Sequence, residues 1–305
     1  MKKLYYPLVF FFLFASALFP AIYLWKLTSF FIGPFHSEKI YRPTDIPVYD
    51  ITFQDDLGAI LKGWLVPGEK GKGVVLILHG YTRNRNILLR RARFLHREGY
   101  SVMLFDFQGH GESSGDYVTF GYRESHNVKA AVSLLRQKYP GEKLAIIGTS
   151  MGAVSVFADG KAAQADAYVL ESPFLILSRY FSVQLSDFYG VKSPVLFFFF
   201  KTLLDMRVGF DVDHFVPREG LKTLTGPLLL VAAREDRFIT LPEIQSFYIF
   251  APKPKELWII DGMDHSDYSH TVSDQYEKKV LAFLQMYLRG SGVWEQQKHL
   301  RDRGH

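Results

Sequence analysis

The sequence predicts an α/β fold in which helices cover both faces of a doubly wound, mostly parallel sheet. One observation is that short, continuous apolar runs recur along the chain, such as 74–78 and 228–232. Runs of this kind are typical of strands that are buried on both faces of a parallel sheet. Another is that segments of helical length alternate with these runs, which is the element order of α/β proteins. Because 48% of the 305 residues are hydrophobic, the chain can also fill one sizeable core.

The predicted elements begin with a hairpin and then alternate. Residues 48–53 and 60–66 are expected to be its two strands, separated by a short polar turn that contains a glycine. Further strands are expected at 74–78, 102–105, 144–147, 167–170, 228–232 and 257–260, and helices at 87–98, 122–139, 242–250 and 272–288. Together these elements define a domain over residues 48–290.

The segment from about residue 174 to residue 226 interrupts this alternation. It contains many helix-forming residues and no clear parallel strand, and it includes the apolar run 195–200. We therefore expect a helical insertion at this point of the domain. The apolar run is expected to pack partly in the core and partly to line a pocket or contact a membrane.

Residues 1–26 are predicted to form a signal-anchor helix. The run 4–25 has no charged residue, is bounded by Lys2-Lys3 and Lys26, and is long enough to span the ~30 Å hydrocarbon core of a bilayer. The lysines before the run favour a cytoplasmic N-terminus, so we expect a single-pass membrane protein whose domain is extracytoplasmic. A cleaved signal peptide is the alternative, because Ala15-Ser16-Ala17 has the small-residue pattern of a cleavage site.

Two further segments complete the predicted organisation. Residues 27–47 are expected to be an interfacial linker, which is aromatic at first and then polar with two prolines. Residues 291–305 are expected to be a basic tail.

Composition excludes several classes of protein. The chain has no cysteine, which excludes disulfide scaffolds, cysteine nucleophiles and thiolate metal sites. The net charge is only +5, and the basic residues form no patch interleaved with aromatic residues, so no nucleic acid is expected as a partner. No metal-binding motif such as H-E-x-x-H occurs, so no metal is expected. Composition leaves the oligomeric state open.

One glycine-rich stretch resembles a cofactor site only in part. Gly109-His110-Gly111, followed by Gly115, approaches the dinucleotide fingerprint G-x-G-x-x-G, but the last glycine comes one residue too late. The region that follows is expected to be helical, so it lacks the strand-end acid that would bind a ribose. We therefore expect no cofactor.

The most informative stretch joins the strand at 144–147 to small, helix-compatible residues. Between them stands Gly148-Thr149-Ser150-Met151-Gly152, a G-x-S-x-G pattern with the serine at its centre. Glycines on both sides allow a turn too sharp for larger residues. Such a turn would hold the Ser150 hydroxyl clear of the sheet, above the N-terminus of the next helix. The alternative is a serine that simply caps an ordinary helix.

This stretch resembles the nucleophile elbow of α/β-hydrolases, and the resemblance extends over about residues 48–288. In that family an acid follows a late strand and a histidine follows the last one. Asp236, after the strand at 228–232, and His265, after the strand at 257–260, match these positions. The resemblance therefore implies a catalytic triad of Ser150, Asp236 and His265. Glu171, after an earlier strand, stays open as an alternative acid.

The same resemblance implies an oxyanion hole. The strand at 74–78 ends in His79-Gly80-Tyr81, similar to the family's His-Gly step, and the backbone N–H groups of Tyr81 and Met151 are the expected donors. His79 and Gly80 are expected to shape this loop, as Gly148 and Gly152 shape the elbow. Residues 106–113 resemble the family's D-x-R-G-x-G-x-S loop, except that Gln108 replaces the arginine.

The resemblance implies an α/β-hydrolase fold with a helical lid at about 174–226 and a serine hydrolase activity on carboxylic esters. The apolar insertion and the predicted anchor favour a lipophilic, lipid-like ester, such as an acylglycerol or a lysophospholipid, and a membrane as a partner. Acyl transfer, thioester hydrolysis and peptide hydrolysis use the same triad and stay open. So does a non-catalytic, membrane-tethered binding protein, although such a protein would usually lack the serine or the histidine.

Overall fold

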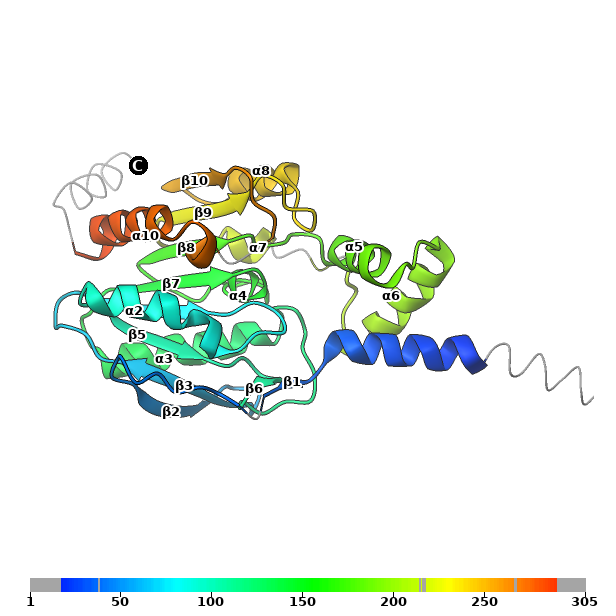
Figure 1. Cartoon of the computed structure of the whole chain (residues 1–305), viewed down its shortest axis with the longest axis horizontal. Helices are drawn as coiled ribbons and strands as arrows, with labels where there is room; N and C mark the ends of the chain where they lie inside the picture. The colour runs from blue at the N-terminus through cyan, green and yellow to red at the C-terminus, as the bar shows by residue number, and fades with distance from the viewer. Residues whose placement is uncertain (1–17, 38, 214, 216–217, 266–267, 290–305) are drawn as a thin grey trace, which may run out of the picture.

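The computed structural model describes residues 18–37, 39–213, 215, 218–265 and 268–289. Eight strands form one sheet in the order β10-β9-β8-β7-β4-β5-β3-β2 (Figure 1). The strands are β2 (Tyr49–Gln54), β3 (Ile60–Val66), β4 (Val74–Leu78), β5 (Ser101–Phe105), β7 (Leu144–Thr149), β8 (Ala167–Glu171), β9 (Leu228–Ala233) and β10 (Lys255–Ile260). All neighbours are parallel except β3, which is antiparallel to both β2 and β5. The predicted, mostly parallel α/β sheet is therefore confirmed.

Helices cover both faces of this sheet, because the side chains of each strand alternate between two apolar layers. In β4, Val74, Leu76 and Leu78 face one layer, while Val75 and Ile77 face the other. The first layer contains α3 (Glu124–Lys138), α4 (Met151–Val154) and α8 (Leu241–Phe250), and the second contains α2 (Leu89–Arg97) and α10 (Ser273–Leu288). Short helices are η1 (Arg85–Leu88), α7 (Arg218–Leu221) and α9 (Tyr268–Thr271).

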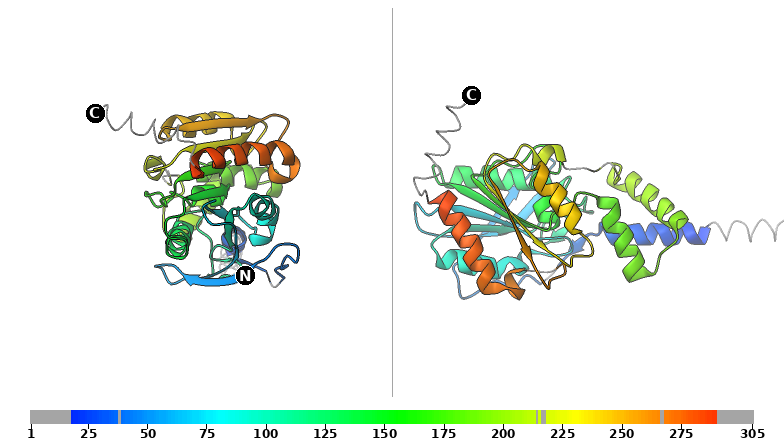
Figure 2. Two further views of the ribbon diagram at one scale, coloured as in Figure 1. Left: turned by 90° about the vertical axis from the view of Figure 1, so that its left-hand side faces the viewer. Right: turned by 90° about the horizontal axis from the view of Figure 1, so that it is seen from above.

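The segment predicted to be an insertion is helical. It contains α5 (Leu177–Tyr189) and α6 (Pro194–Val208), which stand at one end of the sheet together with a helix over residues 18–32, here called the N-terminal helix (Figures 1 and 2). Aromatic rings hold the three helices together: the Phe31 ring meets those of Phe181 and Phe200 edge-on, each at 5.5 Å. After this helix, β1 (Phe35–His36) pairs in parallel with β6 (His110–Gly111).

The prediction of a single-pass membrane anchor is wrong. Residues 4–17 of the predicted span lie outside the described residues, and in the part of the chain that is described no helix is both long and apolar enough to cross a membrane. The N-terminal helix has instead the contacts of a helix packed on protein, because Leu24, Leu27 and Phe31 are buried among core residues. It also extends to residue 32, into the segment expected to be a linker. Apolar side chains such as those of Leu24, Leu27 and Phe31 suit burial in protein as well as in lipid, which is why the sequence alone misled.

Candidate active site

Ser150 stands on a strained turn between β7 and α4. Its backbone has φ 53° and ψ −117°, a conformation that residues with a Cβ rarely adopt. The flanking glycines are required by close packing: a Cβ at Gly148 would lie 2.7 Å from the Gly152 carbonyl oxygen, and one at Gly152 would lie 2.6 Å from the His79 carbonyl oxygen. The Ser150 amide donates to the Glu171 carbonyl at 2.7 Å, which fixes the turn to the neighbouring strand.

The Ser150 side chain is not a helix cap. It makes no capping hydrogen bond to α4, which has only four residues. Instead it lines a cavity of about 460 Å³ at the carboxyl ends of the strands. The hydroxyl is therefore placed where a ligand can reach it.

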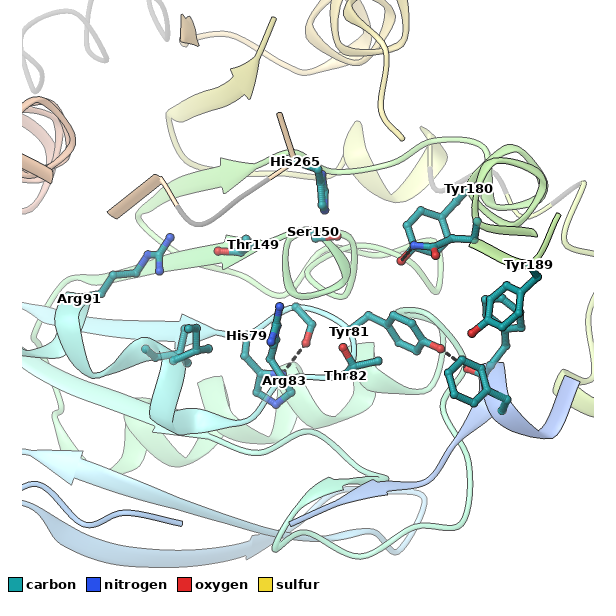
Figure 3. Close-up of a pocket in the computed structure, with 16 residues that line it drawn as sticks. His79, Tyr81, Thr82, Arg83, Arg91, Thr149, Ser150, Tyr180, Tyr189 and His265 are labelled. Atoms are coloured by element: carbon teal, nitrogen blue, oxygen red, sulfur yellow. Dashed lines mark hydrogen bonds between the residues drawn. The ribbon is translucent and has the colours of Figure 1, made fainter. Parts of the chain in front are cut away.

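His265 lines the same cavity and is held by Asp236. Figure 3 shows the imidazole directed toward Ser150. Its Nδ1 atom lies 2.7 Å from Oδ2 of Asp236, which is buried after the end of β9. The other carboxylate oxygen of Asp236 accepts the amides of Phe238 and Ile239, both at 2.9 Å. Asp236 is thus fixed on one side by backbone and presents its free oxygen to the imidazole.

Glu171 has a different environment from that of Asp236. One of its oxygens accepts from Arg91 Nη2 at 2.6 Å and from Thr149 Oγ1 at 2.8 Å, and the other accepts from the Tyr276 hydroxyl. Both Glu171 and Arg91 are buried. Because these partners occupy both oxygens, Glu171 stabilises the strand ends beneath the elbow and does not contact His265.

The loop after β4 lies against the elbow. A Cβ at Gly80 would lie 3.6 Å from the Cβ of Ser150, which is the distance of an ordinary van der Waals contact, so the two backbones lie next to each other. Among the described residues, the amide N–H groups of Tyr81 and Met151 have no hydrogen-bond partner. Two backbone donors beside a serine hydroxyl can bind negative charge that develops on a substrate oxygen.

His79 shapes this loop as a neutral, buried ring. Its Nδ1 donates to the Gly80 carbonyl at 2.8 Å, and its Nε2 accepts the Phe107 amide at 3.0 Å. Burial lowers the pKa of His79 to about 4, so the ring carries no charge at neutral pH. Both nitrogens of His79 are thus engaged in hydrogen bonds within the loops around the site.

A cation replaces the arginine that the sequence lacks at position 108. Arg85, at the start of η1, forms ion pairs with the buried Asp106 and with Glu112. Its guanidinium lies 4.5 Å from the ring centre of Trp64. The charge of Asp106 is therefore balanced by a residue that precedes it by 21 positions.

Sequence reasoning missed one wall of the cavity. Phe30 and Phe31 of the N-terminal helix, with Tyr180 and Tyr189 of α5, line the side of the cavity that faces the three-helix end of the molecule. The two phenylalanines fall in the segment expected to be a linker. Two adjacent aromatic residues are unusual in a linker, and they were the available signal that this segment packs against the domain. Within the described residues, no three His, Asp or Glu side chains come together as a metal site.

Comparisons with known proteins agree with this architecture. Residues 69–208 match the family model described as serine aminopeptidase, S33. An uncharacterized protein, YqkD of Bacillus subtilis, is 27% identical over 242 residues, which are 74% of this chain and 76% of that protein. The uncharacterized protein Rv2307c of Mycobacterium tuberculosis is 28% identical over 229 residues, 72% of each chain.

Solved structures are similar over most of the chain. The Pyrococcus furiosus esterase Pf2001 is 25% identical, with a TM-score of 0.71 over 85% of this chain and 98% of that one. An acetyl xylan esterase from Paenibacillus sp. R4 is 18% identical, with a TM-score of 0.61 over 82% of this chain and 87% of that one. The second similarity is one of fold alone.

Proposed function

Because the chain belongs to the α/β-hydrolase superfamily, we propose that it is a serine hydrolase that cleaves carboxylic esters. The observation that carries the proposal is the pair His265–Asp236, joined at 2.7 Å, because His265 lines the same cavity as Ser150. A serine hydroxyl is a weak nucleophile until a base takes its proton and a third group orients that base. Ser150, His265 and Asp236 are assigned these three roles.

In the proposed reaction, Ser150 Oγ attacks the ester carbonyl carbon while His265 takes its proton. The imidazolium is stabilised by Asp236, and the carbonyl oxygen, now negative, accepts hydrogen bonds from the amides of Tyr81 and Met151. Collapse of this intermediate breaks the bond to the alcohol, which leaves with the proton from His265. Water then attacks the acyl-enzyme with His265 as base, which releases the acid and restores the Ser150 hydroxyl.

The substrate is proposed to be lipophilic. The wall built by Phe30, Phe31, Tyr180 and Tyr189 is aromatic and borders the cavity of about 460 Å³. Apolar walls with few polar groups are typical of sites that bind apolar ligands. Helices α5 and α6 are proposed to act as a lid, because α5 contributes Tyr180, Gln184 and Tyr189 to this cavity. An acylglycerol or a similar lipid-like ester fits these walls.

Aminopeptidase activity is a second candidate, favoured by the family model over residues 69–208. An aminopeptidase must bind the ammonium group of its substrate, for which a carboxylate is the natural partner. Of the described residues that line the cavity, none is acidic, while Arg83 is basic and the charge of Arg91 is paired with that of Glu171. The cavity therefore suits a neutral or anionic ester better than a peptide N-terminus.

The test is labelling with a fluorophosphonate probe, combined with turnover of p-nitrophenyl esters and of an aminoacyl p-nitroanilide. We expect the wild type to be labelled and to cleave the esters, and Ser150→Ala to lose both properties. Ser133→Ala, which removes an exposed hydroxyl on α3, is the matched control and should be labelled like the wild type. Wild-type turnover by Ser150→Ala would disprove the mechanism, and preference for the anilide would favour the aminopeptidase.

A further inference from the structure

We propose that the N-terminal helix is part of the substrate site, and that Phe30 on this helix determines selectivity for the length of the acyl chain. The inference rests on the proposed ester hydrolysis and goes further, because it gives a role in that reaction to a segment that precedes the sheet. It starts from the position of Phe30 and Phe31 in the wall of the cavity that contains Ser150 and His265.

The C-terminal end of the N-terminal helix is fixed to the loops around the site. The last carbonyl groups of a helix have no partner within it. Here the Phe31 carbonyl accepts the Tyr81 hydroxyl at 2.6 Å, and the Ile32 carbonyl accepts the Val118 amide at 2.7 Å. Tyr81 is the residue whose amide is the proposed oxyanion donor. The helix end is thus bonded to the loop that carries the chemistry.

The middle of the same helix is fixed to α6. The Arg207 guanidinium donates to Thr28 Oγ1 at 2.7 Å and to Ser29 Oγ at 2.8 Å. It also lies 4.3 Å from the ring centre of Trp25, which is the geometry of a cation–π contact. Because the helix is held both at its C-terminal end and in its middle, it forms a fixed wall of the cavity.

The two phenylalanines of this wall have different roles. Phe31 is 2% exposed and meets the rings of Phe181, Tyr189 and Phe200, so it holds the three helices together. Phe30 is 57% exposed, and its ring contacts that of Tyr189 at 5.7 Å. Phe30 can therefore be shortened without opening the core, whereas Phe31 cannot.

The position of this wall makes its effect depend on chain length. In Figure 3, Tyr81 extends away from Ser150 toward the N-terminal helix, and Tyr189 lies farther from Ser150 than Tyr180 does. An acyl chain attached to Ser150 that follows Tyr81 must pass Tyr180 before it reaches Tyr189 and Phe30. A short acyl group ends before this wall, while a longer one gains apolar contact with it.

The experiment compares kcat/KM for p-nitrophenyl octanoate and acetate in the full-length wild type, Phe30→Ala and Phe30→Leu. A lost apolar contact of this size changes discrimination by about tenfold. We expect the octanoate-to-acetate ratio to fall about tenfold in Phe30→Ala and less in Phe30→Leu. Phe19→Ala is the matched control, because Phe19 is an exposed aromatic residue of the same helix that does not line the cavity. Its ratio should equal that of the wild type.

The outcomes separate this inference from the proposed function. An unchanged ratio in Phe30→Ala, or an equal fall for both esters, overturns the role of the N-terminal helix. If the wild type cleaves neither ester, or if Ser150→Ala cleaves both, the proposed hydrolysis itself fails. Melting temperatures equal to that of Phe19→Ala show that a changed ratio does not arise from unfolding.

Discussion

The Nδ1 atom of His265 lies 2.7 Å from Oδ2 of Asp236, although 29 positions separate the two residues in the chain. Because a carboxylate only accepts hydrogen bonds, this contact places the ring proton on Nδ1 and leaves Nε2 free to accept one. The same contact occurs elsewhere: His126 Nδ1 also lies 2.7 Å from a carboxylate oxygen, that of Asp56. The two histidine side chains are equally exposed, at 22% and 23%, but only His265 lines the cavity.

This pair of histidines gives the first prediction. His265→Ala should lower kcat on p-nitrophenyl esters by at least ~10³-fold, because Ser150 then has no base to take its proton. His126→Ala should keep the wild-type kcat. Steady-state kinetics measures both, and circular dichroism should show an unchanged fold. If the two variants lose activity equally, the imidazole beside Ser150 is not the base.

The second prediction separates the two buried acids. Asp236→Asn should lower kcat by about 10⁴-fold, since an amide cannot hold the required tautomer of His265. Glu171→Gln removes the buried carboxylate that pairs with Arg91, so it should lower the free energy of unfolding by about 3–5 kcal/mol. Its kcat, measured at a temperature at which the variant is folded, should change much less. The opposite ranking of kcat would assign the acid role to Glu171.

The third prediction concerns stability and pH. The pKa of His79 is lowered to about 4 by burial, below the value of about 6.5 in an unfolded chain. As the pH falls below about 6.5, the unfolded state binds a proton that the folded state does not, so this group destabilises the fold progressively down to pH 4. The loss approaches about 1.4 kcal/mol per pH unit.

Urea unfolding between pH 7 and pH 4.5 tests whether the free energy of unfolding falls with pH in this way. We expect His79→Gln to be less stable than the wild type at pH 7, because it loses the fitted contacts to Gly80 and Phe107. Its free energy of unfolding should nevertheless depend less steeply on pH, since one titrating group has been removed. Parallel curves for the two proteins would show that His79 is not buried in a neutral state.

Much of the fold and the candidate site was predictable because it depends on local pattern. Buried parallel strands are continuous apolar runs, as in Val74–Leu78, and the close contacts at Gly148 and Gly152 require glycine whatever surrounds them. The positions of Asp236 and His265 follow from the ends of strands β9 and β10, which lie side by side in one sheet. Each of these inferences needs only nearby sequence and the order of strands.

The rest depends on contacts that no local pattern specifies. The run 4–25, which leads into the N-terminal helix, has no charged residue, and this property does not distinguish a lipid environment from the aromatic rings of α5 and α6. Likewise, Arg85 balances the charge of Asp106 through a fold that brings η1 beside β5. Contacts of this kind, between residues brought together by tertiary packing, can be identified only from the structure.

The last prediction tests the bond between the catalytic loop and the N-terminal helix. Burial raises the pKa of Tyr81 well above its usual value of 10, so its hydroxyl stays protonated and donates to the Phe31 carbonyl. Tyr81→Phe leaves that carbonyl unpaired, which should lower the free energy of unfolding by about 1–3 kcal/mol. The amide of the same residue is the proposed oxyanion donor. For the acetate ester, kcat should therefore fall, and its fold change should exceed the fold change in KM.

Tyr168→Phe is the matched control for this variant. Tyr168 is also buried, near the first residue of β8 and away from the cavity; its hydroxyl donates to the Ala163 carbonyl at 2.9 Å and accepts from the Ala165 amide at 2.8 Å. A loss of stability at least as large is expected there, with kcat unchanged, because no catalytic group is attached to those contacts. If both variants lose stability equally and neither changes kcat, the Tyr81 hydroxyl only supports the fold. A fall in kcat confined to Tyr81→Phe means that docking of the N-terminal helix positions the oxyanion donor.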